Sequence, residues 1–346
     1  MKKILKRLLP WVLYHTGVLR RLRPGRARGA HGGRFLILMY HRVIAETGYF
    51  KSLCVSPQHF ARQIRYLKEN FSIVTLEEAA QRLKSGDLPD EDQVVITFDD
   101  GYQDNYTHAF PVLRQAGVPA TIFLTAGHIN NDRIFWWDRV ERLAGTLPPG
   151  KTSLKLPEEL YPPELREAVR KLVAGAPERS RPWIQAVVAF LKTIPDEKKH
   201  AILDDLESQA TVPPAKPSPP SLTWDQVREM AQGGIDFGSH TFNHPIMTQV
   251  TPEQARVELS ASKREIEKHL DRPVRYFAYP NGMETDFNAM TERVLQDCGY
   301  EGACLAYGGP NDASVSPWAI KREYIGDFDI PTFAYRLSRV LASSGK

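Results

Sequence analysis

The chain has 346 residues and a net charge of +4, with 42% hydrophobic and 25% charged residues, which is typical of a globular protein with a large core. Its cysteines, Cys54, Cys298 and Cys304, are too few and too irregularly spaced for a disulfide framework or a cysteine-ligated metal. We expect mostly buried thiols, with a Cys298–Cys304 disulfide as the alternative.

The positive charge is concentrated at the N-terminus. Residues 1–30 contain nine Lys and Arg and no acid, whereas the rest of the chain has a net charge of −5. An interrupted apolar stretch of about twelve residues lies between these charges and is too short to cross a bilayer. We predict a basic amphipathic segment that contacts an anionic membrane peripherally, with Trp11 and Tyr14 at headgroup level.

A secretory signal and a disordered tail are the alternatives to this membrane contact. Lys2 and Lys3 precede the apolar stretch, as in a signal peptide, but the arginine cluster behind it opposes export. We therefore expect a location peripheral to the inner membrane or in the cytoplasm, rather than secretion or a periplasmic location. We expect no nucleic-acid binding, because apolar residues interrupt the basic ones.

From residue 34 onward, apolar strands alternate with amphipathic helices, which predicts an α/β fold with a mainly parallel sheet or barrel. Thr75 and Glu78 have the spacing of a helix capping box. Strands are expected at 34–43, 71–74, 93–98, 118–125, 235–238, 274–279, 302–305 and 320–324. Helices are expected from Ser56, from Thr75, over 104–116, from Thr223, from Thr251 to His269, over 286–298 and from Pro331.

The alternation is interrupted over about 131–220, where helical periodicity replaces the strand signal. This part ends in a run with five prolines among residues 213–220, typical of an extended connector. We predict two regions, the basic segment at 1–30 and a barrel at 31–346, with a helical insertion over 131–220 that lies against the barrel.

Two adjacent carboxylates, Asp99 and Asp100, follow the apolar strand residues Val94–Ile96. Such a pair is costly beside an apolar core unless a cation, usually a metal, compensates one of the charges. Because adjacent strand residues point in opposite directions, we expect the two carboxylates to approach a metal differently.

Two histidines four residues apart, His240 and His244, follow another apolar strand. Two neutral imidazoles and one carboxylate form a catalytic site of the zinc type, with an open position for water. The second carboxylate is then available as a base. All four side chains fall at the C-terminal ends of strands, where the active sites of barrels lie.

Three motifs together resemble those of the polysaccharide deacetylases, the NodB-homology family of carbohydrate esterases. They are Thr97–Gly101, His240–His244 and the run Phe277-Ala278-Tyr279-Pro280-Asn281-Gly282, in family order within residues 34–325. The resemblance implies a distorted, incomplete (β/α) barrel. It also implies that Asp100, His240 and His244 bind one divalent metal, Zn²⁺ first and Co²⁺, Ni²⁺ or Fe²⁺ as alternatives. Asp99 is then the base that takes a proton from water.

The general acid departs from the pattern of many relatives, which use a histidine in a late motif. This chain has no histidine after His269. The Tyr40-His41 pair is similar to one in poly-N-acetylglucosamine deacetylases, and this resemblance implies that His41 protonates the leaving amine. That role suits an imidazole that titrates near neutrality. A purely structural histidine is the alternative.

The partner of the base also departs from the pattern, because Ala278 stands where many relatives have an arginine that orients the base. Arg322 or Arg275 could replace it, and we prefer Arg322, although either could equally form a surface salt bridge.

The candidate substrate-binding residues are Tyr279, Pro280, Gly282 and Trp137. Backbone amides of the turn at Pro280 and Gly282, with Tyr279, are candidates to hold an oxyanion. Trp137, together with Trp136 and Trp183, either contacts a sugar or packs the insertion onto the barrel, and we favour packing.

The resemblance implies a metal-dependent hydrolase that removes N-acetyl groups from N-acetylhexosamine units of a polysaccharide or lipid-linked glycan. An O-deacetylase or glycolipid deformylase with the same site is the nearest alternative. An inactive glycan-binding barrel is the third, and the intact cluster of costly polar groups argues against it.

Overall fold

The structure is a computed structural model that describes residues 2–21, 33–45, 51–147, 154–174, 181–210 and 221–343. Part of the predicted basic segment, residues 22–30, lies outside the described residues, as does the predicted proline-rich connector at 213–220.

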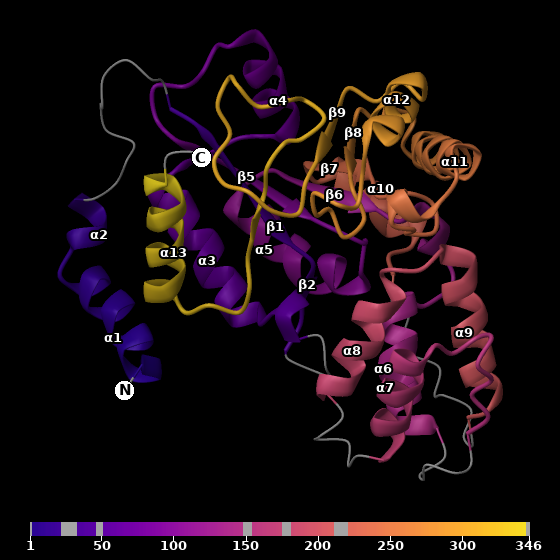
Figure 1. Cartoon of the computed structure of the whole chain (residues 1–346). Helices are drawn as coiled ribbons and strands as arrows, with labels where there is room; N and C mark the ends of the chain where they lie inside the picture. The colour runs from indigo at the N-terminus through magenta and orange to yellow at the C-terminus, as the bar shows by residue number, and fades with distance from the viewer. Residues whose placement is uncertain are drawn as a thin grey trace.

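A curled parallel sheet forms the centre of the molecule (Figure 1). Its strand order is β10-β1-β5-β6-β7-β8-β9, with β4 also paired to β5. A bridge between Cys304 and Ile320 joins β9 to the segment that leads into β10, so the two edges of the sheet approach each other. This architecture confirms the predicted incomplete barrel. The strands are β1 (Phe35–Tyr40), β4 (Ser72–Ile73), β5 (Gln93–Phe98), β6 (Ala120–Leu124), β7 (Ile235–Ser239), β8 (Tyr276–Ala278), β9 (Gly302–Cys304) and β10 (Glu323–Tyr324).

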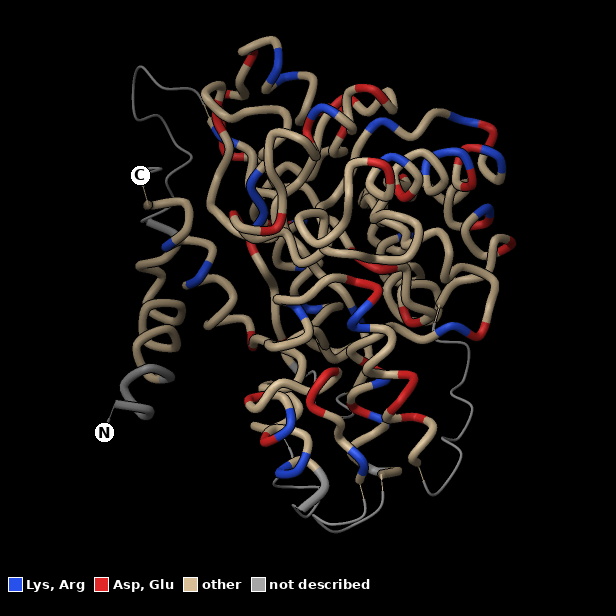
Figure 2. Tube along the Cα trace, turned by 45° about the vertical axis from the view of Figure 1, so that its right-hand side comes forward, with Lys and Arg blue, Asp and Glu red and all other residues tan. Residues whose placement is uncertain are grey.

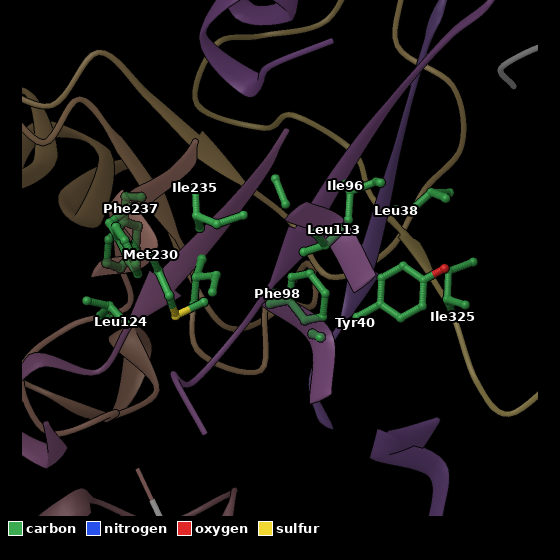
Figure 3. Packing of buried hydrophobic residues seen from close by; sticks show 14 of the residues in the cluster. Leu38, Tyr40, Ile96, Phe98, Leu113, Leu124, Met230, Ile235, Phe237 and Ile325 are labelled. Carbon is green, nitrogen blue, oxygen red and sulfur yellow. The ribbon is translucent and has the colours of Figure 1, made fainter. Parts of the chain in front are cut away.

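The central strands are buried on both faces, as is usual for a parallel sheet covered by helices. All six residues of β1 are buried, and so are five of the six in β5. At the C-terminal ends of these strands Tyr40 and Phe98 stack with ring centroids 5.4 Å apart (Figure 3). The strand ends that precede the predicted site residues are therefore anchored in the main apolar cluster.

Helices begin close to where the sequence predicts them. The side chains of Ser56, Thr75, Thr223 and Thr251 each accept a backbone N–H bond from the first turn of a helix. The predicted helix over 104–116 is divided into a π-helical turn, Asn105–Ala109, and the helix α5. The helices around the sheet are α3 (Pro57–Asn70), α4 (Leu76–Ser85), α5 (Phe110–Ala116), α10 (Trp224–Gln232), α11 (Pro252–Leu270), α12 (Ala289–Asp297) and α13 (Ile330–Ala342).

The predicted insertion is helical throughout its described regular elements and lies below the sheet in Figure 1. Its helices share a hydrophobic cluster of their own, to which the aromatic side chains around residues 135–137 contribute. They are α6 (Trp136–Thr146), α7 (Pro163–Ala174), α8 (Arg181–Leu191) and α9 (Asp196–Ser208).

The N-terminal helices α1 (Lys2–His15) and α2 (Val18–Arg21) pack against α13, at the left of Figure 1. Gly17, with φ +73°, separates them. Among the described residues, no helix has the length and apolarity needed to span a membrane.

The three cysteines form no disulfide, so the alternative of a Cys298–Cys304 bond is wrong. Cys54 and Cys304 are buried and Cys298 is half-buried.

Candidate metal centre and active site

The strand β5 delivers the two carboxylates. The N–H of Asp99 still donates to the carbonyl of Tyr40 on β1, at 3.0 Å. The chain then turns, with φ +75° at Asp100 and +77° at Gly101. Both carboxylate residues are 2% exposed. Because Asp100 lies in this left-handed turn beyond the end of the strand, the turn, and not strand alternation, sets the direction of its side chain.

The loop after β7 delivers the two histidines. His240 Nδ1 donates to the carbonyl of Ala278 at 2.7 Å, which leaves Nε2 as the ring nitrogen with a lone pair. Thr241 (φ +67°) and His244 (φ +65°) are left-handed, and the Thr241 hydroxyl accepts the His244 N–H at 2.8 Å. The Glu258 carboxylate accepts two further N–H groups of this loop, at 2.8 and 2.7 Å. The His240 ring is therefore oriented by its own hydrogen bond, and the backbone of the loop is held by Thr241 and by Glu258 of α11.

The structure brings Asp100, His240 and His244 together. Asp100 Oδ1 lies 3.6 Å from His240 Nε2 and 3.5 Å from His244 Nε2. One ligand atom from each residue falls within 4.8 Å of the others, and Asp100 Oδ1 is buried without a hydrogen-bond partner. A buried, unpartnered carboxylate oxygen facing two imidazole nitrogens fits a divalent cation between them.

Burial sets the protonation of these three side chains. It lowers the pKa of His240 and lowers that of His244 well below the usual value, so both rings are neutral, as metal ligation requires. Burial, reinforced by the charge of Asp99, raises the pKa of Asp100 well above its usual range. A cation beside Asp100 would keep this carboxylate ionised.

Asp99 is held by a bidentate ion pair with Arg322. Arg322 Nη1 donates to Asp99 Oδ1 at 2.7 Å and Nη2 donates to Oδ2 at 2.8 Å. Burial acts to raise the pKa of Asp99, but the fully buried guanidinium outweighs it and holds the pKa below its usual value. Arg275 instead pairs with two glutamates, each at 3.1 Å, and is partly exposed. The structure thus places Arg322, and not Arg275, beside Asp99.

His41 follows directly after β1. Its carbonyl accepts a hydrogen bond from Asn105 Nδ2 at 2.8 Å, and its buried ring atom Nδ1 has no hydrogen-bond partner. Loss of hydration lowers the pKa of His41 to about 4, although the nearby Asp99 charge acts in the opposite direction. The ring is therefore neutral in the resting protein, and its role as the acid stays a prediction.

Tyr279 does not face the site. Its side chain is fully buried, its hydroxyl donates to the carbonyl of Trp318 at 3.0 Å, and its ring stacks on Phe287 at 4.4 Å. Its backbone N–H donates to the carbonyl of Cys304. The prediction that Tyr279 binds substrate is wrong, because it shares the core-facing side of the chain with Phe277, two residues before it.

The turn after Tyr279 is tightly packed. Pro280 is buried, and Gly282 (φ +59°) accepts the Ala306 N–H at 2.9 Å. A Cβ on Gly282 would lie 2.8 Å from the Ala306 nitrogen, so a glycine is needed here. A role for the amides of this turn toward the substrate stays a prediction.

Trp137 lies against a predicted metal ligand. Its ring centroid is 4.6 Å from that of His244, and its Nε1 donates to the Tyr102 hydroxyl at 3.0 Å. Trp137 is only 7% exposed, which leaves little of the ring for a sugar. Trp136 is also buried, and Trp183 packs at the edge of the insertion's own cluster. These contacts agree with the favoured packing interpretation.

A family model described as polysaccharide deacetylase matches residues 87–150 and 189–303, which is just over half of the chain. The chain belongs to the polysaccharide deacetylase family. The internal interval that the family model leaves unmatched, residues 151–188, falls inside the helical insertion.

Individual relatives agree with this assignment. The Bacillus subtilis protein YxkH, which has a provisional polysaccharide deacetylase name, is 24% identical over 287 residues, covering 83% of this chain and 69% of YxkH. A poly-β-1,6-N-acetyl-D-glucosamine N-deacetylase of Staphylococcus aureus strain N315 is 30% identical over 120 residues, covering 31% of this chain and 41% of that protein. The substrate named for the second relative thus comes from a protein matched over less than half of its length.

Solved structures share the fold. The deacetylase PplD of Streptococcus pyogenes, in complex with acetate, superposes with a TM-score of 0.57 at 21% identity, covering 89% of this chain and 99% of PplD. IcaB from Ammonifex degensii has a TM-score of 0.56 at 19% identity, covering 90% and 99%. Membership of the polysaccharide deacetylase family makes the protein a carbohydrate esterase and a hydrolase. The family is metal-dependent, and Asp100, His240 and His244 form the group among the described residues that suits a metal.

One site feature of this deacetylase was missed in the sequence. Lys192, just after α8, donates from Nζ to Asn281 Oδ1 at 2.5 Å, so the insertion reaches the turn of the third motif. Its charge adds to burial in lowering the pKa of His41. A lysine within a helical segment carries no pattern that would predict this contact.

Gly127 is expected to be essential for the geometry of the metal site. Its N–H donates to the carbonyl of Phe242 at 2.8 Å, between the two metal-site histidines, and a Cβ would lie 2.5 Å from that oxygen. Gly127→Ala should displace the histidine loop and weaken Zn²⁺ binding by about 10–100-fold in titration calorimetry. Gly309→Ala is the matched control, because no atom lies within 4 Å of its Cβ position and its backbone is not left-handed. Equal affinity in both variants would contradict the prediction.

Proposed function

We propose that the protein removes N-acetyl groups from N-acetylhexosamine units of a polysaccharide or lipid-linked glycan, with poly-N-acetylglucosamine as the first candidate. The observation that carries this proposal is the convergence of Asp100, His240 and His244 beside the ion-paired Asp99. The activity of the staphylococcal relative supports the choice of substrate.

Asp100, His240 and His244 would hold one divalent ion, Zn²⁺ first and Co²⁺, Ni²⁺ or Fe²⁺ as alternatives, because the donor set is two nitrogens and one oxygen. When bound, the ion would acidify a water molecule and polarise the amide carbonyl.

Asp99 takes a proton from the attacking water in this proposal. The Arg322 guanidinium donates one hydrogen bond to each carboxylate oxygen of Asp99. Each oxygen keeps a further lone pair that can accept the proton from water. The ion pair also fixes the orientation of Asp99 and keeps it ionised before turnover.

His41 delivers a proton to the leaving amine. Since the ring is neutral at rest, it must first gain that proton during turnover. The proton that Asp99 takes from water can pass to His41, and Asp99, again ionised, then favours the charged ring.

The activity is tested by measuring acetate release from N-acetylated β-1,6-glucosamine oligosaccharides by the metal-loaded protein. O-acetylated and N-formylated analogues are compared in the same assay. Release of acetate only from the O-acetylated sugar, or of formate only, would replace the proposal by an O-deacetylase or a deformylase. No release from any of them would favour a glycan-binding barrel.

His41→Ala should lower the rate on an N-acetyl substrate by about 10²–10⁴-fold, because the amine then leaves without a proton donor. An activated aryl acetate, whose leaving group needs no proton, should be hydrolysed at nearly the original rate. Steady-state kinetics on both substrates, at equal metal content, check this result. An unchanged rate on the amide, or equal losses on both substrates, would remove the acid role.

A further inference from the structure

The structure describes the side chains of α1 from Leu8 onward. The first of these residues include an unusual group of exposed apolar side chains. Leu8, Leu9, Trp11 and Val12 are 51%, 48%, 55% and 41% exposed. Elsewhere among the described residues, the large hydrophobic side chains that are similarly exposed are Val257 and Met283, on separate elements. Scattered exposed apolar residues need no explanation, but four within five consecutive positions indicate an interaction surface.

The opposite side of α1 is attached to the barrel. Tyr14 contacts Tyr66 of α3 at 6.4 Å between ring centroids, and Tyr66 in turn contacts Phe333 of α13 at 5.9 Å. Leu19, in α2, is only 5% exposed. Figure 1 shows α1 and α2 lying along α13, away from the insertion. The apolar surface of α1 is thus held in one orientation relative to the catalytic barrel.

The charge around this surface identifies the partner. Residues 1–30 have a charge of +9 with no acidic residue, while the rest of the chain is at −5. Residues 8–15 of α1 contain no Lys, Arg, Asp or Glu, whereas Figure 2 shows blue and red segments mixed over most of the body. An apolar, tryptophan-containing helix face within a basic segment fits the boundary between headgroups and acyl chains of an anionic bilayer.

We infer that α1 docks the protein on an anionic lipid bilayer, with Leu8, Leu9, Trp11 and Val12 inserted at the interface. The bilayer is contacted from one side, because the apolar surface is short and the helix is attached to α13. The docking would hold the barrel beside a membrane, where a lipid-linked or nascent glycan is concentrated. The link to such a glycan rests on the proposed function, whereas the docking itself does not.

Co-sedimentation with vesicles of phosphatidylglycerol and phosphatidylcholine tests the inference on the full chain. The protein should pellet with these vesicles, more weakly at high salt and at least about tenfold more weakly with pure phosphatidylcholine. The variant Leu9→Gln/Trp11→Gln should lose at least about tenfold in partitioning. The control Val257→Gln/Met283→Gln removes the same kind of exposed apolar surface elsewhere and should bind as the unmodified protein does.

Other occupants of the surface give different results. Binding that is equal for both variants, or no binding to anionic vesicles, would overturn the inference. So would a stable dimer in light scattering that Leu9→Gln/Trp11→Gln converts to a monomer, because the surface would then join two copies. Acetate release from a soluble oligosaccharide should be unchanged in both variants, and a failure of the proposed activity would leave the vesicle result unaffected.

Discussion

Replacing Asp99 by asparagine should reduce turnover by about 10²–10⁴-fold while the protein still binds its metal. The side chain is 2% exposed and lies beside the Asp100–His240–His244 group without belonging to it. Asparagine keeps the size of the residue and one acceptor for Arg322, but it cannot take a proton from water. Acetate release and metal content, measured on the same preparations, check the expected result.

His240→Ala is the matched comparison for Asp99→Asn. It removes a nitrogen that lies 3.6 Å from Asp100 Oδ1, and should therefore lose both the metal and the activity. The two variants together separate the base from the ligands. Substantial turnover by Asp99→Asn would exclude Asp99 as the base, and loss of metal in that variant would make it a ligand.

Arg322→Met should destabilise the fold as well as slow the reaction. Removing one partner of a buried ion pair leaves the Asp99 carboxylate uncompensated, which costs about 3–5 kcal/mol of unfolding free energy. Arg322→Lys should lose less stability than Arg322→Met, because lysine keeps the positive charge beside Asp99. Some loss remains, since lysine cannot donate the two parallel hydrogen bonds of the guanidinium. Urea unfolding of chelator-treated protein measures this effect without a contribution from bound metal.

A double-mutant cycle identifies the cause of that loss. The variant Asp99→Asn/Arg322→Met has no buried carboxylate left without a partner, so it should be more stable than Arg322→Met alone. If the losses of the two single variants simply add, Arg322 stabilises the fold through packing or through its bond to the Leu305 carbonyl at 2.7 Å, and not through Asp99.

Local sequence patterns predicted the elements well. The strand expected at 93–98 is β5, and the cap residues Ser56, Thr223 and Thr251 all precede helices, because alternation and capping are decided by neighbours in the chain. The sequence also predicted that Asp100, His240 and His244 lie close together, as they do in the structure. This was predictable because the C-terminal ends of parallel strands meet at one edge of the sheet.

The sequence was least informative where tertiary packing decides. Tyr279 belongs to a motif, but the sequence does not show that its ring stacks on Phe287 inside the core. The pKa of His41 depends on how completely other elements shield the ring from water. The choice between Arg322 and Arg275 was a preference in the sequence, and only the curling of the sheet shows which arginine reaches Asp99.

The pairing of Asp99 with Arg322 has a consequence for biosynthesis. The two residues are 223 positions apart, and Arg322 belongs to the last tenth of the chain. At a translation rate of about 5–20 residues per second, the ribosome needs roughly 10–45 s to reach the arginine after making the aspartate. During that interval the nascent polypeptide holds a carboxylate that cannot yet be buried favourably. Maturation of the catalytic centre therefore awaits the end of translation, and chains that stop prematurely before Arg322 should be targets for proteolysis rather than active fragments.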